Sequence, residues 1–405
     1  MARFLSILLV TTMLYCPPVT YGDTAHSATL ILISIDGFRW DYLDQYPTPH
    51  MRAIAEQGVR ATRMTTVYPS KTFPSHLSLA TGLSPADHGI VDNNFCDRDR
   101  GQCYRLGDGR KDATWIKGIP LWNLVELHGH KAATFFWPES DARIGGQTPT
   151  YHYHYSKQAP YTERVDQVLD WLQLPASARP KLITLYFSAV DTMGHRHGPD
   201  SPEVAAAIAE VDALIGRLWK LTQAQSDPIN LLVVSDHGMA EVRSEHAIDV
   251  SELPTAAGFN VLNGGTRVAY YREDDTANVE NLRAALQEAA RGRYEVLSEA
   301  TLQERGVKPD ATTPDLLIET APPAVFRNQL SGESWVGGTH GYPAEVDEMS
   351  AFLIAAGPAF RSGLAIPQVH QLDVYPVAAK VMGVKPLKPL PSDGGALTEA
   401  LLTNP

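Results

Sequence analysis

Seven polar residues, mostly aspartate and histidine, lie in short segments that are spread along the chain. Three of these segments are apolar runs that stop abruptly at an acid, such as the run Leu-Ile-Ser-Ile before Asp36. Carboxylates and imidazoles gathered at the ends of strands are what a two-zinc site requires. A threonine among them indicates a nucleophile that is activated by metal. The seven residues are Asp36, Thr72, Asp191, His195, Asp236, His237 and His340.

Each of these motifs has an ordinary explanation when it is taken alone. Asp191 and His195 are four residues apart, so they face the same way on a helical turn, as many surface pairs do. Asp236 and His237 follow an apolar run, as residues of a simple turn also do, and His340 between glycines is more often a loop histidine. The joint occurrence of all these segments in one chain favours metal binding.

Thr72 stands before Phe73 and Pro74 near the expected start of a helix. Threonine and serine are common helix caps and proline suits the first turn, so this segment has a purely structural interpretation. The same geometry serves chemistry, because a helix N-terminus offers N–H groups and a partial positive charge to a phosphate. A threonine bound to zinc there would lose its hydroxyl proton at neutral pH.

The rest of the chain alternates between strand-like and helix-like segments. Continuous apolar runs predict buried parallel strands, and amphipathic segments that end at glycine or another stop signal predict helices. The expected strands are 29–35, 131–137, 182–190, 229–234, 268–271, 316–318 and 352–356, the last being the final strand of the chain. The expected helices are 49–58, 75–81, 119–128, 161–172, 202–222, 279–290 and 373–382.

This order of elements predicts an α/β fold with a mainly parallel central sheet flanked by helices. Asp36, Asp191 and Asp236 each fall at or just past the carboxyl end of an expected strand. Ligands bind at that edge of open α/β sheets, so the three acids are expected to converge although they are far apart in sequence. The segments from about residue 240 to residue 340 predict an inserted smaller α/β lobe.

The first 22 residues have the pattern of a secretory signal peptide, with Arg3 before a short apolar run. We therefore expect an exported protein, periplasmic or secreted, whose mature chain 23–405 is one domain with an insertion. The apolar run is too short to favour a transmembrane helix and no later stretch is long enough, so no stable membrane anchor is expected. Cys96 and Cys103 remain as the mature cysteine pair, and we expect them to form a disulfide.

The formal net charge of the chain is −12, and its acidic residues are spread rather than grouped. An acidic surface argues against nonspecific binding to nucleic acid, and no specific nucleic-acid partner is expected. For an anionic substrate, local metal charge must overcome this global field. The sequence carries no signal for an oligomeric state.

Short motifs recur in order along most of the chain. They are Ile35–Arg39, Lys71–His76, Thr81–Leu83, His88–Asn93, Phe136–Pro138, Asp191–His195, Ser235–Met239 and Gly338–Gly341. Over about residues 28 to 380 they resemble the nucleotide pyrophosphatase/phosphodiesterase family of the alkaline phosphatase superfamily, in particular its single-domain bacterial members. The resemblance implies an alkaline-phosphatase-like fold, a catalytic domain and two zinc ions. The implied ligands are Asp191, His195 and His340 for one zinc, and Asp36, Asp236, His237 and the Thr72 oxygen for the other.

The resemblance also implies which residues surround the substrate. Asn93 would donate a hydrogen bond to a non-bridging phosphoryl oxygen, and the backbone N–H of Phe73 would donate another. The ring of Phe73 would form one wall of a nucleobase slot and Tyr155 the other, with Tyr151 as the second candidate. The structural alternative for residues 151–155 is a surface strand in which tyrosine alternates with histidine.

The implied activity is zinc-dependent hydrolysis of nucleotide phosphodiester or pyrophosphate bonds. It would release nucleoside 5′-monophosphates through a covalent intermediate on Thr72. One alternative is a phosphodiesterase for choline phosphodiesters or lysophospholipids, which the family also contains. Another is a noncatalytic zinc-binding protein, which would not explain why Thr72 and Asn93 are placed around a phosphate.

Two further features bear on this assignment. His197 occupies a position where members of the family often carry an aromatic residue, so it is a rival ligand to His195. An alkaline monoesterase usually has a serine nucleophile and an arginine that clamps the dianion. Here the nucleophile is threonine, and the arginines nearest to it in sequence, Arg52 and Arg63, lie in segments without a motif. The sequence therefore favours diesters over monoesters.

Overall fold

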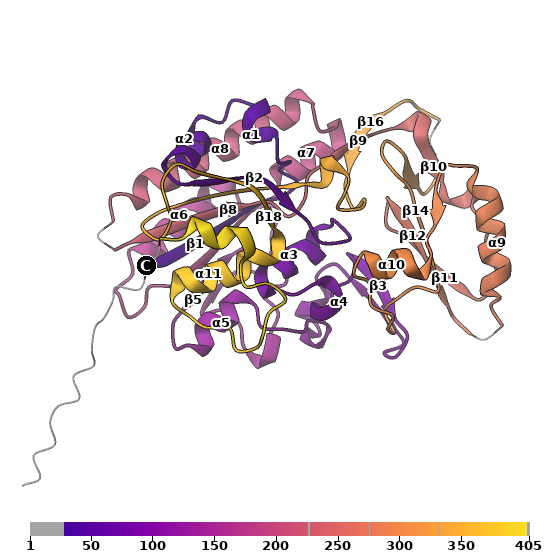
Figure 1. Cartoon of the computed structure of the whole chain (residues 1–405), viewed down its shortest axis with the longest axis horizontal. Helices are drawn as coiled ribbons and strands as arrows, with labels where there is room; N and C mark the ends of the chain where they lie inside the picture. Colours follow the sequence, from indigo (N-terminus) through magenta and orange to yellow (C-terminus); the bar gives the residue numbers. More distant parts are fainter. Residues whose placement is uncertain (1–27, 226, 275, 331, 403–405) are drawn as a thin grey trace, which may run out of the picture.

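The computed structural model describes residues 28–225, 227–274, 276–330 and 332–402, and the expected signal peptide lies outside these residues. An eight-stranded sheet forms the centre of the molecule, with helices on both faces and a smaller lobe to one side (Figure 1). In spatial order its strands are β18 (Leu364–His370), β2 (Val59–Thr65), β17 (Ala351–Ala356), β8 (Ile229–Val234), β1 (Thr29–Ile35), β7 (Leu182–Phe187), β5 (Ala132–Phe135) and β6 (Tyr151–His152).

The central sheet is mainly parallel, as the sequence predicts. The pairs β18–β2, β8–β1, β1–β7, β7–β5 and β5–β6 are all parallel. Within the described residues, β17 is the strand of this sheet that runs against the others, since it pairs antiparallel with β2 and β8. The carboxyl ends of β8, β1 and β7 therefore lie side by side at one edge, and this edge carries the site.

Strand β1 is buried along its whole length and supplies both layers of the core. Leu30 and Leu32 face one set of helices, and Ile31 and Ile33 face the other, as the alternation of a strand requires. The first face is covered by α3 (Thr72–Thr81), α5 (Leu121–Leu127) and α11 (Val374–Met382). The second is covered by α2 (Pro49–Gln57), α6 (Tyr161–Leu172) and α8 (Pro202–Thr222), with α1 (Tyr42–Gln45) and α7 (Ala189–His197) beside them. The short helix α4 (Pro85–His88) follows α3.

The smaller lobe is an insertion, as expected. Its entry strand β9 (Ala240–Arg243) pairs antiparallel with its exit strand β16 (Val336–Thr339), so the two ends of the insertion are held together. The lobe has its own four-stranded antiparallel sheet and its own apolar core. Its elements are β10 (Ala247–Asp249), β11 (Phe259–Asn263), β12 (Arg267–Arg272), α9 (Val279–Ala290), β13 (Glu295–Val296), α10 (Glu299–Glu304), β14 (Leu316–Glu319) and β15 (Val325–Arg327).

A disulfide closes the hairpin of β3 (Asn94–Asp97) and β4 (Gln102–Arg105), because Cys96 and Cys103 lie opposite one another on its two strands. The expected cysteine pairing is therefore confirmed. The hairpin also contacts the lobe, since Arg98 Nη1 lies 3.1 Å from Asp315 Oδ2. In Figure 1, β3 lies directly beside the lobe.

Several sequence predictions of element bounds and order are wrong. The helix expected at 75–81 begins at Thr72, because the extended Lys71 already caps it and accepts the N–H of Ser75 at 2.9 Å. The strand expected at 182–190 ends at Phe187, and α7 begins two residues later. β17 is not the final strand, since β18 follows it. Strands β2 and β18 lack a continuous apolar run, because both mix buried residues with partly or fully exposed ones.

Among the residues that the structure describes, no helix combines the length and apolar character that a membrane crossing requires.

Candidate active site and metal centre

Three acids converge at the carboxyl edge of the central sheet. Asp36 follows β1 directly, Asp191 lies in the first turn of α7 just after β7, and Asp236 follows β8 after one residue. The convergence is tight, because the backbone N–H of Asp191 donates to the carbonyl oxygen of Asp36 at 3.1 Å and that of Gly37 donates to Asp236 Oδ1 at 3.1 Å. A side chain at Gly37 would place its Cβ 2.9 Å from the Cα of Asp191, so glycine permits this approach.

The acids and histidines form two overlapping groups that are suited to metal ions. In one group Asp36, Asp236 and His237 place a ligand atom each within 4.8 Å of one another, and in the other Asp191, His237 and His340 do the same. His195 Nε2 lies 3.2 Å from Asp191 Oδ1, and His340 Nε2 lies 3.6 Å from the same oxygen. The structure thus brings all six predicted Asp and His ligands together, with His237 between the two groups.

Three histidines share one orientation at this site. In each ring Nδ1 lies within hydrogen-bond distance of a backbone carbonyl, so Nε2 faces the carboxylates. Such a backbone partner fixes the ring and leaves Nε2 available as a ligand, which is the usual outer shell of a metal-binding histidine. The pairs are His195 with Gly338 at 2.8 Å, His340 with Ser70 at 3.0 Å and His237 with Gly238 at 2.9 Å.

Within the part of the chain that the structure describes, three buried carboxylate oxygens at the centre lack a hydrogen-bond partner: Asp36 Oδ1, Asp191 Oδ1 and Asp236 Oδ2. Buried carboxylates are costly unless they are hydrogen-bonded or coordinate a cation. The three oxygens face imidazole nitrogens rather than donors of the backbone. Oxygen and imidazole ligands without thiolates fit metal ions, and zinc accepts both ligand types.

The charge balance of the protein without metal also points to a cation site. Burial raises the pKa of Asp36 well above its usual value, and the carboxylates of Asp236 and Asp191 raise it further. Burial would lower the pKa of His195, but the Asp191 carboxylate outweighs burial and raises that pKa to about 9. Burial would lower the pKa of His237 as well, but Asp236 raises it. Protons here balance negative charge that a metal ion would otherwise balance.

Thr72 lies beside this centre as the first residue of α3. Its Oγ1 is 3.3 Å from His237 Nε2, and its side chain is partly accessible from the pocket. The buried His76 steadies this end of the helix, since its Nδ1 lies 2.8 Å from the Thr72 carbonyl oxygen and its Nε2 lies 2.8 Å from Ser34 Oγ. The helix start therefore holds the hydroxyl against the group formed by Asp36, Asp236 and His237.

Asn93 also lies next to the start of α3, where its side chain is hydrogen-bonded to the backbone of Phe73. The backbone N–H of Phe73 donates to Asn93 Oδ1 at 3.0 Å, so it is already engaged and is not a free donor for phosphate. This bond fixes the amide plane of Asn93 and leaves its NH2 group as the donor. The N–H that was expected to contact phosphate is thus hydrogen-bonded to Asn93 in this structure.

A cavity of about 460 Å³ opens beside these groups and contains both walls of the expected slot. Phe73 and Tyr155 line it together with Thr72 and Asn93. Tyr155 is 47% exposed, and its ring packs edge-on against Phe136 with centroids 5.3 Å apart. An exposed aromatic face next to a nucleophile is suited to stacking with a base.

The structure separates the rival candidates from the site. Tyr151 stacks on Trp171 and donates its hydroxyl to the Ala178 carbonyl oxygen at 3.0 Å, so its role is structural. His197 is directed toward Glu203, with Nδ1 and Oε1 3.9 Å apart, while His195 faces Asp191. Geometry therefore favours Tyr155 over Tyr151 and His195 over His197.

Several residues of the site were missed in the sequence. The hydroxyl of Tyr186 donates to Asp36 Oδ2, and the one available signal was a tyrosine in the buried, largely apolar strand β7. The cavity is also lined by Leu106 and Arg110, whose segments carried no signal for this position, and by Glu139, which follows the Phe136–Pro138 motif. No sequence motif pointed to Arg267, which comes from the lobe and pairs with Asp92, next to Asn93.

Residues 30–343 match the family model described as type I phosphodiesterase / nucleotide pyrophosphatase. The venom phosphodiesterase CdcPDE of Crotalus durissus collilineatus is 32% identical over 393 residues, which cover 93% of this chain and 46% of that protein. The bis(5′-adenosyl)-triphosphatase enpp4 of Xenopus laevis is 29% identical over 391 residues, which cover 93% of this chain and 83% of that protein. The chain spans about half the length of the venom phosphodiesterases that it matches.

Solved structures show the same fold. Murine ectonucleotide pyrophosphatase/phosphodiesterase 5 has a TM-score of 0.84 and 26% identity, with 92% of this chain and 100% of that chain covered. An inactive threonine-to-alanine variant of that murine protein is known in complex with AMP, with the same TM-score of 0.84. The alkaline-phosphatase-like architecture that was expected from the sequence is confirmed.

Proposed function

Because the chain belongs to the type I phosphodiesterase / nucleotide pyrophosphatase family, we propose that it hydrolyses nucleotide phosphodiester or pyrophosphate bonds and releases nucleoside 5′-monophosphates. The observation that carries the proposal is the position of Thr72. Its hydroxyl lies between the acid and histidine centre and an aromatic-lined cavity of about 460 Å³. Related proteins include a bis(5′-adenosyl)-triphosphatase and an inactive threonine variant solved with AMP, which support a nucleotide substrate.

The proposed cofactor is a pair of zinc ions held by the Asp and His residues of the two groups. The assignment is Asp191, His195 and His340 for one ion, and Asp36, Asp236, His237 and Thr72 for the other. When bound, the ions supply the positive charge that lowers the pKa of the threonine hydroxyl and stabilises the leaving oxygen.

In the proposed reaction Thr72 Oγ1 attacks phosphorus while its proton passes to solvent. The bond from phosphorus to the leaving oxygen breaks on the opposite side, and its electron pair stays with that oxygen. The product is a nucleotidyl ester of Thr72. Water then cleaves this ester, which releases the nucleoside 5′-monophosphate and restores the hydroxyl. Asn93 donates from its NH2 group to a non-bridging oxygen, where charge develops in the transition state.

The function can be tested by comparing kcat/KM on three chromogenic esters: a nucleoside 5′-monophosphate aryl ester, a phosphocholine aryl ester and a simple aryl monoester. We expect the nucleotide diester to be the best substrate. A preference for the phosphocholine ester would replace the proposal with a choline phosphodiesterase, and absence of turnover on all three would favour a noncatalytic zinc protein.

The base slot gives a prediction for Tyr155→Ala. Stacking contributes about 1–3 kcal/mol per base, and about 1.36 kcal/mol corresponds to tenfold in rate. The variant should therefore lose about ten- to a hundredfold in kcat/KM on a nucleotide diester if stacking is felt in the transition state. It should behave like the wild type on a methyl aryl diester, which has no base.

Tyr155→Phe is the matched control, because it keeps the ring and should stay close to wild type on both diesters. Equal losses of Tyr155→Ala on the nucleotide and the methyl diester would show that Tyr155 supports the fold instead of the substrate.

We also propose that the protein is exported, to the periplasm or outside the cell. The Cys96–Cys103 disulfide supports this, because disulfides form and persist in oxidising compartments.

A further inference from the structure

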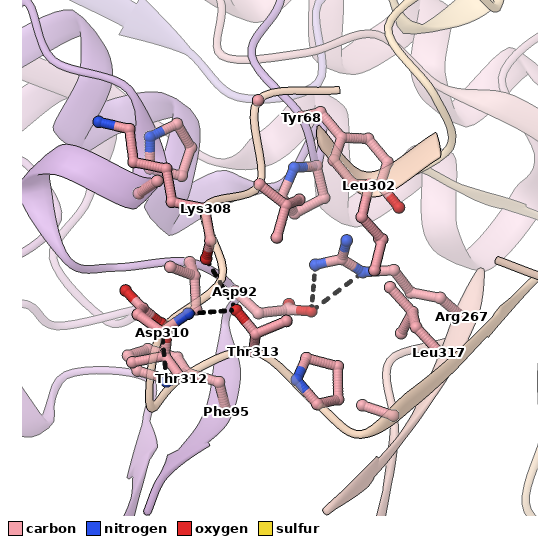
Figure 2. A pocket seen from close by; sticks show the side chains of 18 of the residues that line it. Tyr68, Asp92, Phe95, Arg267, Leu302, Lys308, Asp310, Thr312, Thr313 and Leu317 are labelled. Carbon is pink, nitrogen blue, oxygen red and sulfur yellow. Dashed lines mark hydrogen bonds and ion pairs between the residues drawn. The ribbon is translucent and has the colours of Figure 1, made fainter. Parts of the chain in front are cut away.

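The contact between the lobe and the central domain contains a buried ion pair. Arg267, on β12 of the lobe, directs Nε and Nη2 to Asp92 Oδ2 at 3.1 and 2.5 Å (Figure 2). The side chains of Arg267 and Asp92 are 7% and 16% exposed. A small cavity of about 50 Å³ lies next to the pair, and Tyr68, Leu302 and Leu317 line it. The pair is therefore largely shielded from solvent, and buried pairs of this kind are sensitive to the loss of one partner.

The other oxygen of Asp92 leads directly to the proposed machinery. Asp92 Oδ1 accepts the backbone N–H of Asn93 at 2.6 Å and lies 3.3 Å from Lys71 Nζ. The side-chain oxygen of Asn93 then accepts the N–H of Phe73, which follows Thr72. One chain of contacts thus runs from the lobe through Asp92 and Asn93 to the start of α3.

Lys71 provides a second link between this series of contacts and the lobe. Its Nζ donates to the Gly264 carbonyl oxygen at 2.6 Å, and Gly264 lies in the turn between β11 and β12. A Cβ at Gly264 would lie 2.7 Å from this nitrogen, so the lysine fits closely against the turn. Asp92 therefore receives two positive groups, one at each oxygen. Removing Arg267 would still leave Lys71 to balance the carboxylate.

We propose that Arg267 is a positioning residue of the reaction, through which the inserted lobe fixes the amide of Asn93 beside Thr72. Arg267 holds Asp92, Asp92 holds the backbone of Asn93, and neither Arg267 nor Asp92 contacts the reacting atoms. This inference rests on the proposed function, because the amide has a kinetic role only if Asn93 contacts the phosphoryl group. Correct placement matters, since a shift of about 1 Å in a reacting or binding group can cost on the order of a hundredfold in rate.

A double-mutant cycle tests the inference on the full-length, zinc-loaded protein with a nucleoside 5′-monophosphate aryl ester. Arg267→Met should lower kcat by about ten- to a hundredfold and change KM little. If Arg267 acts through Asn93, adding Arg267→Met to Asn93→Ala should cost less than about threefold more, because coupled residues are not additive. Losses that multiply in the double variant would overturn the inference.

Arg98→Met is the matched control, because Arg98 also ties the central domain to the lobe, through Asp315 at 3.1 Å, without touching Asp92 or Asn93. It should keep kcat within about threefold of wild type, because the Arg98 side chain is partly exposed and Asp315 keeps its second partner, Arg272, at 2.8 Å. A loss equal to that of Arg267→Met would show general loosening of the lobe and would also overturn the inference. If Arg267→Met does not fold, Arg267→Lys takes its place in the cycle, since lysine keeps the charge but not the paired N–H donors. Non-additive losses with Asn93→Ala would again support the inference, and losses that multiply would overturn it. Failure of the wild type to hydrolyse the ester would instead refute the proposed function.

Discussion

Replacing Thr72 by alanine should lower kcat on a nucleotide diester by more than about a thousandfold, because the attacking oxygen is lost. The substitution removes one hydroxyl at the start of α3. The backbone contacts that fix this end, such as the Ser75 N–H to the Lys71 carbonyl oxygen, do not depend on that hydroxyl. The fold should therefore persist, and circular dichroism with a thermal melt should match the wild type.

Thr72→Ser is the control for this experiment, since it keeps the hydroxyl and should retain part of the activity. Mass spectrometry of a reaction quenched early should detect a nucleotidyl group on Thr72 in the wild type and none in Thr72→Ala. Near-normal kcat in the alanine variant, with zinc still bound, would rule out Thr72 as the nucleophile.

Buried elements of the fold were the most predictable from the sequence. β1, β8, α6, α8 and α9 have the bounds that the apolar patterns predict, because each buries a continuous run or one clear face. The strands β2 and β18 at one side of the sheet were missed. Fewer than half of their residues are buried, and pairing with neighbours far away in sequence stabilises them. A local hydrophobic pattern cannot identify strands that pair from distant parts of the sequence.

The residues of the candidate site also fall into a predictable and an unpredictable group. The acids at strand ends were predictable, because parallel topology forces the ends of β8, β1 and β7 to one edge. Contacts between remote segments were not predictable from local patterns. The Arg267–Asp92 pair joins residues 175 positions apart, and the Tyr186–Asp36 hydrogen bond joins residues 150 apart. No local motif distinguishes these residues, and only the folded structure brings each of them next to its partner.

The overall charge of −12 opposes the approach of an anionic nucleotide, so the proposed reaction depends on positive charge supplied locally. The helix start at Thr72 offers only part of this charge. The three buried carboxylates, Asp36, Asp191 and Asp236, make the electrostatic potential at the phosphate more negative unless bound cations neutralise them. Removal of the metal ions should therefore have a large effect on turnover.

Chelation should abolish turnover, and protein purified without chelator should contain about two zinc ions per chain. Adding zinc back should restore activity in proportion to the ions bound. Zinc affinity should rise with pH, with the following sign. Without metal, the pKa of His195 is raised to about 9 by Asp191. At neutral pH a proton must therefore leave before zinc binds, and above that pKa this competition disappears.

His195→Ala and His197→Ala form a matched pair for the ligand assignment, because both residues lie on α7 but only His195 faces Asp191. His195→Ala should lose one zinc and most activity, while His197→Ala should keep two zinc ions and wild-type kcat. Calorimetry in two buffers of different ionisation heat should detect proton release on zinc binding in the wild type and less of it in His195→Ala. Active wild-type protein with one metal ion or none would refute the two-zinc site. The carboxylates would then need protons or hydrogen-bond donors to make their burial tolerable.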